Sequence, residues 1–239
     1  EFIMSEKYLG GIKIEITSRY ENPTPTILYT ACMNVLGKVA DSVSAIEVVY
    51  DGTTTFNAKR INDIFKDKKC NYTVMHDGGL GYSQNDSSVP ATWKIDLSKE
   101  DWFAFEDNFG TSEEKAFIAY FKSFVPELKR KYDKVFLLRN ERQLHIYSFN
   151  GGERFEPDYV LFLHSNKESG YEQLQVFIEP KGTHLLEKDS WKEKFLLEIE
   201  DKAVATKIFV DDNNYRIWGF HFYNEARRMT EFATDMSRL

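Results

Sequence analysis

The spacing of hydrophobic positions changes several times along the chain, and a helical spacing is clearest between residues 111 and 131. From Phe117 to Leu128 apolar residues recur at intervals of three and four, which predicts an amphipathic helix. Pro126 is expected to kink or end this helix one turn before Lys131. The apolar stripe comprises Phe117, Ile118, Phe121, Phe124, Val125 and Leu128.

Shorter apolar runs follow, and they predict strands. The expected strands are 135–138, 144–149, 158–163, 174–179, 206–210 and 216–223. Asn150-Gly151-Gly152 predicts a turn because these residues accept positive φ, and the polar residues 164–171 are expected to connect two strands. A helix is expected over 191–200, begun by Asp189 or Ser190, and another at the C-terminus. The order is helix, strands, helix, strand.

The first hundred residues have a different pattern. They predict strands at 11–18, 45–50 and 72–75 and helices at 27–39 and 57–66. Residues 76–90 are rich in Gly, Ser, Asp and Asn, which is typical of a linker. We therefore expect a smaller α+β connecting region over residues 1–100. Residues 101–239 are expected to form an α/β domain with a central mixed sheet flanked by helices.

Composition limits the kinds of protein that this chain can be. Its 239 residues are 42% hydrophobic and 15% aromatic, enough for a substantial globular core. No apolar run approaches the roughly 20 residues that span a bilayer, and no signal peptide is visible, so a cytoplasmic protein without a membrane partner is expected. The chain also lacks a nucleotide-binding P-loop.

The net charge of -7 argues against a protein that coats DNA over a whole face, but the average hides a basic stretch. Residues 129–142 hold six basic residues against two acidic ones, a local net charge of +4. For residues 129–131 alone, cations that complement a helix dipole are the favoured interpretation. The position of the stretch before the charged strand ends nevertheless predicts DNA phosphate contacts from Lys131, Lys134, Arg139 and Arg142.

Two charged motifs lie at the ends of the predicted apolar strands. Pro157-Asp158 begins one strand, and Glu179-Pro180-Lys181 closes the next. Because side chains alternate along a strand, Glu179 and Lys181 point the same way, and Asp158 on an antiparallel neighbour can lie beside Glu179. Two carboxylates this close repel unless a divalent cation lies between them. The pattern therefore predicts a Mg²⁺ site that activates water for attack on a phosphate, with Lys181 stabilising the developing negative charge.

Each motif also has a purely structural interpretation. Pro-Asp is a common strand start, Glu-x-Lys occurs by chance, and Asp158 could simply accept backbone hydrogen bonds. Charged side chains at the ends of strongly apolar strands nevertheless carry a desolvation cost that a surface position would avoid. Their occurrence on two adjacent predicted strands favours the catalytic interpretation.

The acidic start of the amphipathic helix has two interpretations. Thr111-x-x-Glu114 matches a capping box, and Glu113 and Glu114 both suit the positive end of a helix dipole. Sequence alone favours the cap. One glutamate could instead point inward and join the metal site, and Glu114 is preferred because it lies nearer than Glu113 to the centre of the apolar stripe.

Four segments closely resemble the C-terminal endonuclease domain of the restriction (Res) subunit of type III restriction-modification enzymes, which belongs to the PD-(D/E)xK nuclease superfamily. The resemblance covers roughly residues 100 to 223. It implies a PD-(D/E)xK restriction-endonuclease-like core. The segments are Gly110–Lys115, Leu138–Glu141, Arg154–Leu163 and Phe177–Gly182.

The resemblance also implies a role for each site residue. Asp158, Glu179 and Lys181 would be the catalytic triplet, and Glu114 would be the carboxylate supplied by the helix. The main-chain carbonyl of Pro180 would join Asp158 and Glu179 as a further metal ligand. The implied activity is Mg²⁺-dependent hydrolysis of double-stranded DNA that leaves 5'-phosphate and 3'-hydroxyl ends.

In the family that this chain resembles, the nuclease domain follows a helicase-like motor in one polypeptide, and the methyltransferase (Mod) subunit is a partner. This chain has neither a Walker A motif nor an Asp-Glu-x-His motor box. We therefore expect a C-terminal piece in which ATP acts only through the absent motor. The alternative is a catalytically silent nuclease-like module for DNA binding or subunit assembly, against which the retention of all three charged residues argues.

Overall fold

The computed structural model describes residues 15, 17, 22–42, 52–56, 59–66, 81–167, 170–202, 204–205 and 215–239. The chain divides into two compact units, Glu1–Val49 and Tyr50–Leu239. The first unit holds helix α2 (Pro25–Ser42), which starts at a proline whose fixed φ suits the first helical turn. The helix expected over 27–39 is thus confirmed. The strands expected at 45–50, 72–75 and 206–210, and most of that at 11–18, lie outside the described residues.

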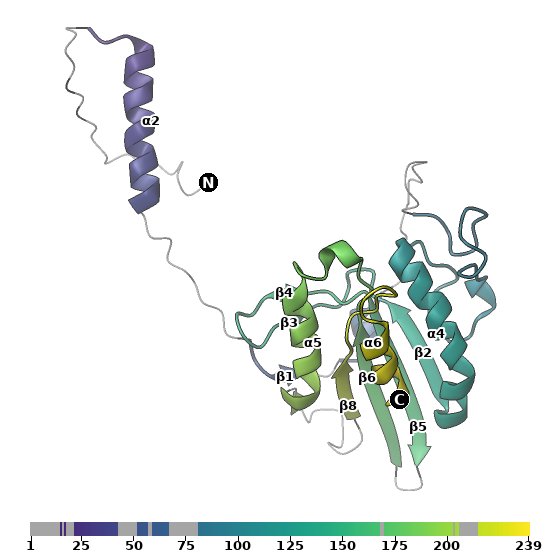
Figure 1. Ribbon diagram of the computed structural model, residues 1–239. Helices are drawn as coiled ribbons and strands as arrows, with labels where there is room; N and C mark the ends of the chain where they lie inside the picture. Colours follow the sequence, from purple (N-terminus) through teal and green to yellow (C-terminus); the bar gives the residue numbers. More distant parts are fainter. Residues whose placement is uncertain are drawn as a thin grey trace. The chain divides into compact units, whose positions relative to one another are not determined.

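A four-stranded mixed sheet forms the centre of the second unit (Figure 1). Its strands, in spatial order, are β2 (Lys134–Arg139), β5 (Tyr159–Lys167), β6 (Gly170–Ile178) and β8 (Tyr215–Gly219). The pairings β2–β5 and β5–β6 are antiparallel, and β6–β8 is parallel. The predicted α/β class with a mixed sheet is confirmed.

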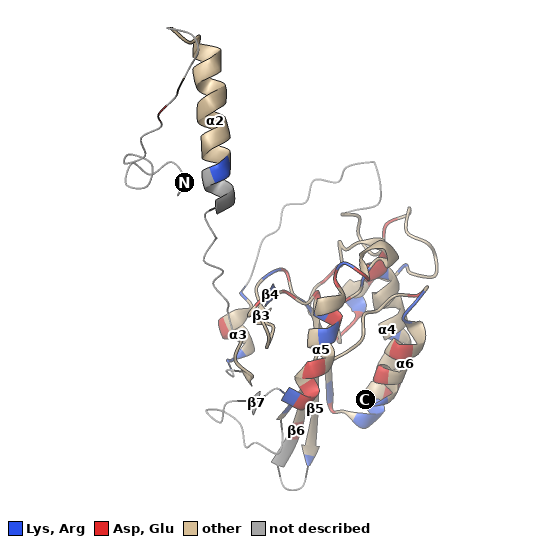
Figure 2. Cartoon of the chain, turned by 60° about the vertical axis from the view of Figure 1, so that its left-hand side comes forward, with Lys and Arg blue, Asp and Glu red and all other residues tan. Residues whose placement is uncertain are grey.

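Helices cover both faces of this sheet. Leu161 and Leu163 of β5 pack in one core with α4 (Ser112–Lys131) and α6 (Met229–Ser237). Val160, on the opposite face, packs in a second core with α5 (Ser190–Lys202). Figure 2 shows α4 and α6 side by side and α5 apart from them. Successive side chains of a strand point to opposite faces of the sheet, so the apolar residues of β5 contribute alternately to the two cores.

Smaller elements complete the second unit. Strand β1 (Thr55–Phe56) pairs with β7 (Val204–Ala205) in parallel, and β3 (Ile146–Tyr147) pairs with β4 (Arg154–Phe155) antiparallel. The predicted turn between β3 and β4 is confirmed, with φ of 88° at Gly151 and 60° at Gly152. Short helices lie at α3 (Ile61–Ile64), Leu97–Lys99 and Thr183–Leu185. No described helix combines the length and apolar character that crossing a membrane requires.

Several predicted element bounds differ from the structure, among them the end of the helix at Pro126 and the ends of β5 and β8. Helix α4 continues past Pro126 to Lys131, because Pro126 is on the exposed side while Val125 and Leu128 are buried. Strand β5 continues through the predicted polar connection to Lys167, since β6 supplies a hydrogen-bonding partner along its whole length. Strand β8 ends at Gly219, and the chain after it pairs irregularly with the end of β6.

Residues before 101 also contribute to the core of the second unit. Leu97 is buried in the same cluster as Phe121, and the buried Gln84 side chain accepts a hydrogen bond from Asn108 Nδ2 at 2.9 Å. The predicted division of the chain near residue 100 stays a prediction. The compact second unit itself begins at Tyr50.

Candidate functional site

A cleft of about 600 Å³ lies where β5 begins and β6 ends. Charged side chains make up most of its wall, in contrast to the aromatic cores on either side of the sheet. The lining residues that carry charge are Glu114, Arg139, Glu141, Arg142, Arg154, Glu156, Asp158, Glu179 and Lys192.

Asp158 and Glu179 meet in this cleft because of the β5–β6 register. Tyr159 pairs with Ile178, so the residues one step outward on each strand stand opposite each other. The Asp158 backbone N–H donates to Glu179 Oε2 at 2.9 Å. The structure thus brings together the two carboxylates that the sequence predicts as a pair.

Asn140 fixes the backbone beside this pair. Its Nδ2 donates to the carbonyl oxygens of Pro157 at 2.8 Å and Leu144 at 2.7 Å, while its backbone N–H donates to the Asp158 carbonyl at 2.8 Å. Its Oδ1 accepts from the N–H groups of Gln143 and Leu144. Because Asn140 is buried with its amide satisfied, it ties the turn after β2 to the start of β5.

The electrostatic environment opposes the charge on both carboxylates. Desolvation, followed by the charges of Glu179 and Glu114, raises the pKa of Asp158 well above its usual range. Desolvation also raises the pKa of Glu179, although Lys181 offsets part of this effect. A divalent cation between the two carboxylates would relieve the repulsion, so the donor set fits a hard cation.

The described residues do not form a larger metal cluster. Within the part of the chain that the structure describes, no group of three or more His, Cys, Asp and Glu side chains is arranged to hold a metal ion. Mg²⁺ usually takes only one or two protein carboxylates and keeps waters or phosphate oxygens as its other ligands. Asp158 and Glu179 are therefore a sufficient pair for that ion.

Lys181 lies against Glu179, as the Glu-x-Lys spacing predicts. Its Nζ is 2.7 Å from Glu179 Oε1 and 3.0 Å from Asp189 Oδ2. Burial alone would lower the pKa of Lys181, but the two carboxylates outweigh it and leave the pKa raised. Pro180 is buried, forms a bridge to Tyr223 and is not among the residues that line the cleft.

Glu114 caps the helix, as the sequence favours, and also lines the cleft, while its part in a metal site stays a prediction. Its Oε2 accepts from the Thr111 backbone N–H at 2.5 Å, and Thr111 Oγ1 accepts from the Glu114 N–H, which completes a capping box. Its Oε1 accepts from Arg139 Nη2 at 3.0 Å and Nε at 3.2 Å, and both residues line the cleft. Glu113 instead lines a separate hollow of about 180 Å³ with Trp93.

The four predicted DNA contacts separate into two pairs. Arg139 and Arg142 line the cleft, but Arg139 is engaged by Glu114 and Glu141 while Arg142 is exposed. Lys131 lies at the exposed end of α4, and Lys134 lines a different hollow of about 780 Å³. Arg142 has a φ of 58°, an uncommon conformation for a residue with a side chain.

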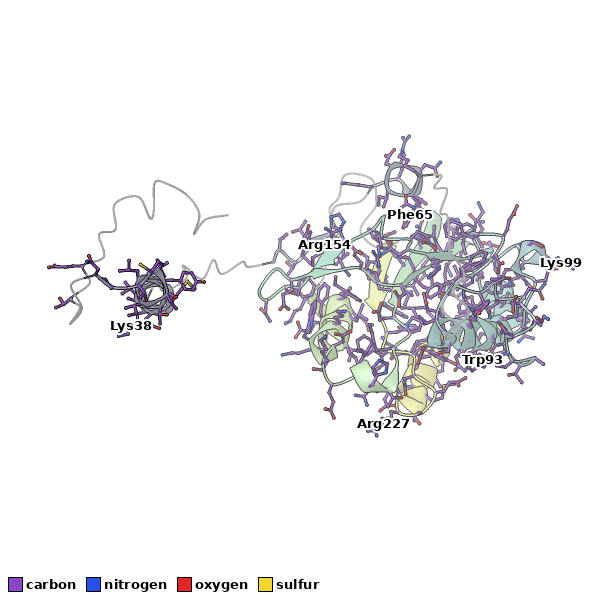
Figure 3. All side chains as sticks on the ribbon, turned by 90° about the horizontal axis from the view of Figure 1, so that it is seen from above. Lys38, Phe65, Trp93, Lys99, Arg154 and Arg227 are labelled. Atoms are coloured by element: carbon purple, nitrogen blue, oxygen red, sulfur yellow. The ribbon has the colours of Figure 1, made fainter. Side chains whose placement is uncertain are left out.

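Sequence reasoning missed several residues of the cleft. Arg154 and Glu156 form an ion pair at 2.5 Å on its wall, and Lys192 reaches it from α5, a helix that carries basic and acidic residues (Figure 2). Figure 3 shows Arg154 on the opposite side of the unit from Lys99. The sequence predicts Asp189 only as a possible helix start. Arg154 lies on the short strand β4, Glu156 lies between β4 and β5, and Asp189 and Lys192 lie at the start of α5, so no apolar periodicity assigns them a direction.

Together, the fold and the cleft define an α/β domain with paired carboxylates and a lysine at the ends of adjacent central strands. Residues 49–235 match the family model of the HI_1054_C C-terminal domain, and the chain belongs to this family. A Haemophilus influenzae protein with the name "Uncharacterized protein" is 30% identical over 212 residues, which are 86% of this chain. The chain spans 43% of the length of that relative. No solved structure matches the chain.

Proposed function

We propose that this chain is a Mg²⁺-dependent DNA endonuclease domain that hydrolyses phosphodiester bonds. The observation that carries the proposal is the meeting of Asp158 and Glu179 in one cleft, with Lys181 Nζ 2.7 Å from Glu179. Paired carboxylates with raised pKa values beside a lysine are typical of catalytic sites rather than of surface ion pairs.

We further propose that the domain has a PD-(D/E)xK core and serves as the cleavage module of a type III restriction enzyme. The order α4, β2, β5, β6, α5, β8 supports the first part, with the carboxylates on the two central strands. The second part is supported by the four segments of the resemblance, because residues from each contribute to or adjoin the cleft. Double-stranded DNA, the Mod subunit and an ATP-driven motor would then be its partners.

The metal would be held by Asp158 and Glu179, with the Pro180 carbonyl as a third protein ligand. When bound, Mg²⁺ polarises a phosphate and lowers the pKa of a water ligand. Lys181 presents its ammonium beside Glu179, where it can stabilise negative charge on the reacting phosphate. Arg142, which is exposed and lines the cleft, would bind a neighbouring phosphate of the DNA.

Glu114 and Arg139 organise the opposite wall of the cleft. Arg139 is enclosed, with its side chain 17% exposed, and the Glu114 charge counters the lowering of its pKa by burial. Because its Nε and Nη2 donate to Glu114 and its Nη1 donates to Glu141, Arg139 would support the wall of the cleft rather than contact DNA. Glu114 in turn adds negative charge near Asp158 and strengthens the attraction for a cation.

Plasmid cleavage tests the proposal. Supercoiled plasmid incubated with the purified chain and Mg²⁺ should be nicked or linearised, and EDTA should stop the reaction. Asp158→Ala and Lys181→Ala should each lower the rate by at least about a hundredfold, since they remove a metal ligand and a charge-stabilising group. Lys188→Ala, which changes an exposed lysine outside the cleft, is the matched control and should cleave like the unaltered chain.

The same assay distinguishes an active nuclease from the alternative, a catalytically silent module. DNA binding by the unaltered chain with no Mg²⁺-dependent cleavage would favour binding or subunit assembly. Cleavage that persists in Asp158→Ala or Lys181→Ala would show that another site carries the activity.

A further inference from the structure

Asp189, which is not among the proposed catalytic residues, contacts the proposed catalytic Lys181. Asp189 lies directly before α5, and its Oδ2 is 3.0 Å from Lys181 Nζ and 3.1 Å from Lys192 Nζ. The Lys181 and Asp189 side chains are enclosed, with 11% and 15% of their surfaces exposed. Lys181 therefore stands between two carboxylates, of which only Glu179 lines the cleft.

A divalent cation at Asp158 and Glu179 would compete with Lys181 for the same carboxylate. Lys181 Nζ occupies a position 2.7 Å from Glu179 Oε1, and an ammonium this close repels a second cation. Asp189 offers the ammonium another partner at hydrogen-bonding distance, so Lys181 can remain in place when Glu179 turns to the metal. The negative charge of Asp189 also offsets the positive charge of Lys181 near the metal.

We infer that Asp189 is a positioning residue that holds Lys181 and thereby allows Glu179 to bind a divalent cation. This inference rests on the proposed function, because it assumes a metal at Asp158 and Glu179. Asp189 does not touch the metal or the DNA itself. Asp189 also pairs with Lys192, whose side chain lines the cleft, so one carboxylate contacts both lysines.

Titration calorimetry of the purified chain with Mg²⁺ alone, without DNA, tests the inference. Asp189→Asn keeps the shape of the side chain but removes its charge, and should weaken Mg²⁺ binding at least about tenfold, as loss of a group that orients a metal ligand does. Asp189→Glu restores a carboxylate and should recover part of the affinity. Glu198→Gln, which breaks a partly exposed 3.0 Å ion pair with Lys202 on the same helix, is the matched control and should bind Mg²⁺ normally.

A double-mutant cycle identifies the residue through which Asp189 acts. In a Lys181→Met background, Asp189→Asn should change Mg²⁺ affinity by less than about twofold, because the ammonium that Asp189 restrains is gone. Unchanged affinity in Asp189→Asn alone, or a full loss repeated in the Lys181→Met background, would overturn the inference. If the unaltered chain binds no Mg²⁺, the proposed function fails with it, whereas normal binding by both the unaltered chain and Asp189→Asn overturns only the role of Asp189.

Discussion

Asp158 is a carboxylate whose surroundings disfavour its charge. Desolvation and the neighbouring Glu179 and Glu114 raise its pKa, and the raised pKa means that the folded chain holds the proton more tightly than the unfolded chain does. Under the proposed function, this unfavourable charge would be kept because the bound cation needs it. Without metal, the charged form of Asp158 therefore lowers the stability of the fold.

We predict that Asp158→Asn stabilises the metal-free chain by about 1 kcal/mol at pH 8, or roughly 2–4 °C in melting temperature. A carboxyl with a raised folded-state pKa contributes full stability below its unfolded pKa and loses it as pH rises through the folded pKa. The advantage of Asp158→Asn should thus be small at pH 4 and grow toward pH 8. Thermal melts in EDTA across this range measure it.

The control for this prediction is Asp201→Asn, which changes an exposed aspartate of α5. Its melting temperature should follow that of the unaltered chain at every pH, because exposed charges contribute little. Asp158→Asn melting below the unaltered chain at pH 8 would count against an electrostatically strained site.

At the scale of elements, one residue at the start of α4 both caps the helix and contacts a residue of the cleft. Glu114 closes the capping box with Thr111 and holds Arg139 with its other oxygen. This arrangement needs space at Gly110, since a Cβ there would lie 2.7 Å from both Cβ and Oε2 of Glu114. Glycine at this position therefore allows Glu114 to fold back over the helix start.

We predict that Gly110→Ala destabilises the second unit by about 1 kcal/mol, the usual effect of losing a helix cap. The new methyl group would push Glu114 from Thr111 and from Arg139. Urea denaturation measures the change. The control is Gly37→Ala in α2, where, among the described residues, no atom outside the backbone of the helix and the two neighbouring residues lies within 4 Å of the new Cβ, and alanine favours the helix. Equal stability of Gly110→Ala and the unaltered chain would contradict the assigned role of Glu114.

The sequence predicts elements well where one apolar periodicity governs them. The stripe from Phe117 to Leu128 marks α4, and the apolar runs mark β5 and β6. Element ends depend on tertiary contacts that periodicity does not record. Pro126 remains in α4 because buried neighbours hold the helix, and the polar end of β5 is strand because β6 pairs with it.

The same distinction applies to the site. Asp158 and Glu179 are predictable as a pair because strand ends restrict their positions, and their common cleft agrees with that reasoning. Asn140, Asp189 and Lys192 lie in a turn, a helix start and the first turn of a helix. Their directions depend on packing between distant segments, so the sequence pattern alone does not identify them.

At the scale of the whole molecule, we expect charge to couple the proposed DNA binding to the proposed metal. The chain has a net charge of -7, and the charged lining of the cleft comprises five carboxylates and four cations, a formal charge of -1. A single divalent ion would change that local charge to +1. DNA phosphates should therefore enter the cleft together with the metal, since the polyanion is otherwise repelled there.

The most direct measurement is X-ray diffraction, at the manganese absorption edge, from crystals of the chain grown with Mn²⁺ and a short DNA duplex. The account predicts an anomalous peak between the carboxylates of Asp158 and Glu179, at about 2.0–2.2 Å from an oxygen of each, with a DNA phosphate oxygen as another ligand. Lys181 should remain beside Asp189 in that complex. Duplex bound elsewhere on the protein, with no metal at Asp158 and Glu179, would contradict the account.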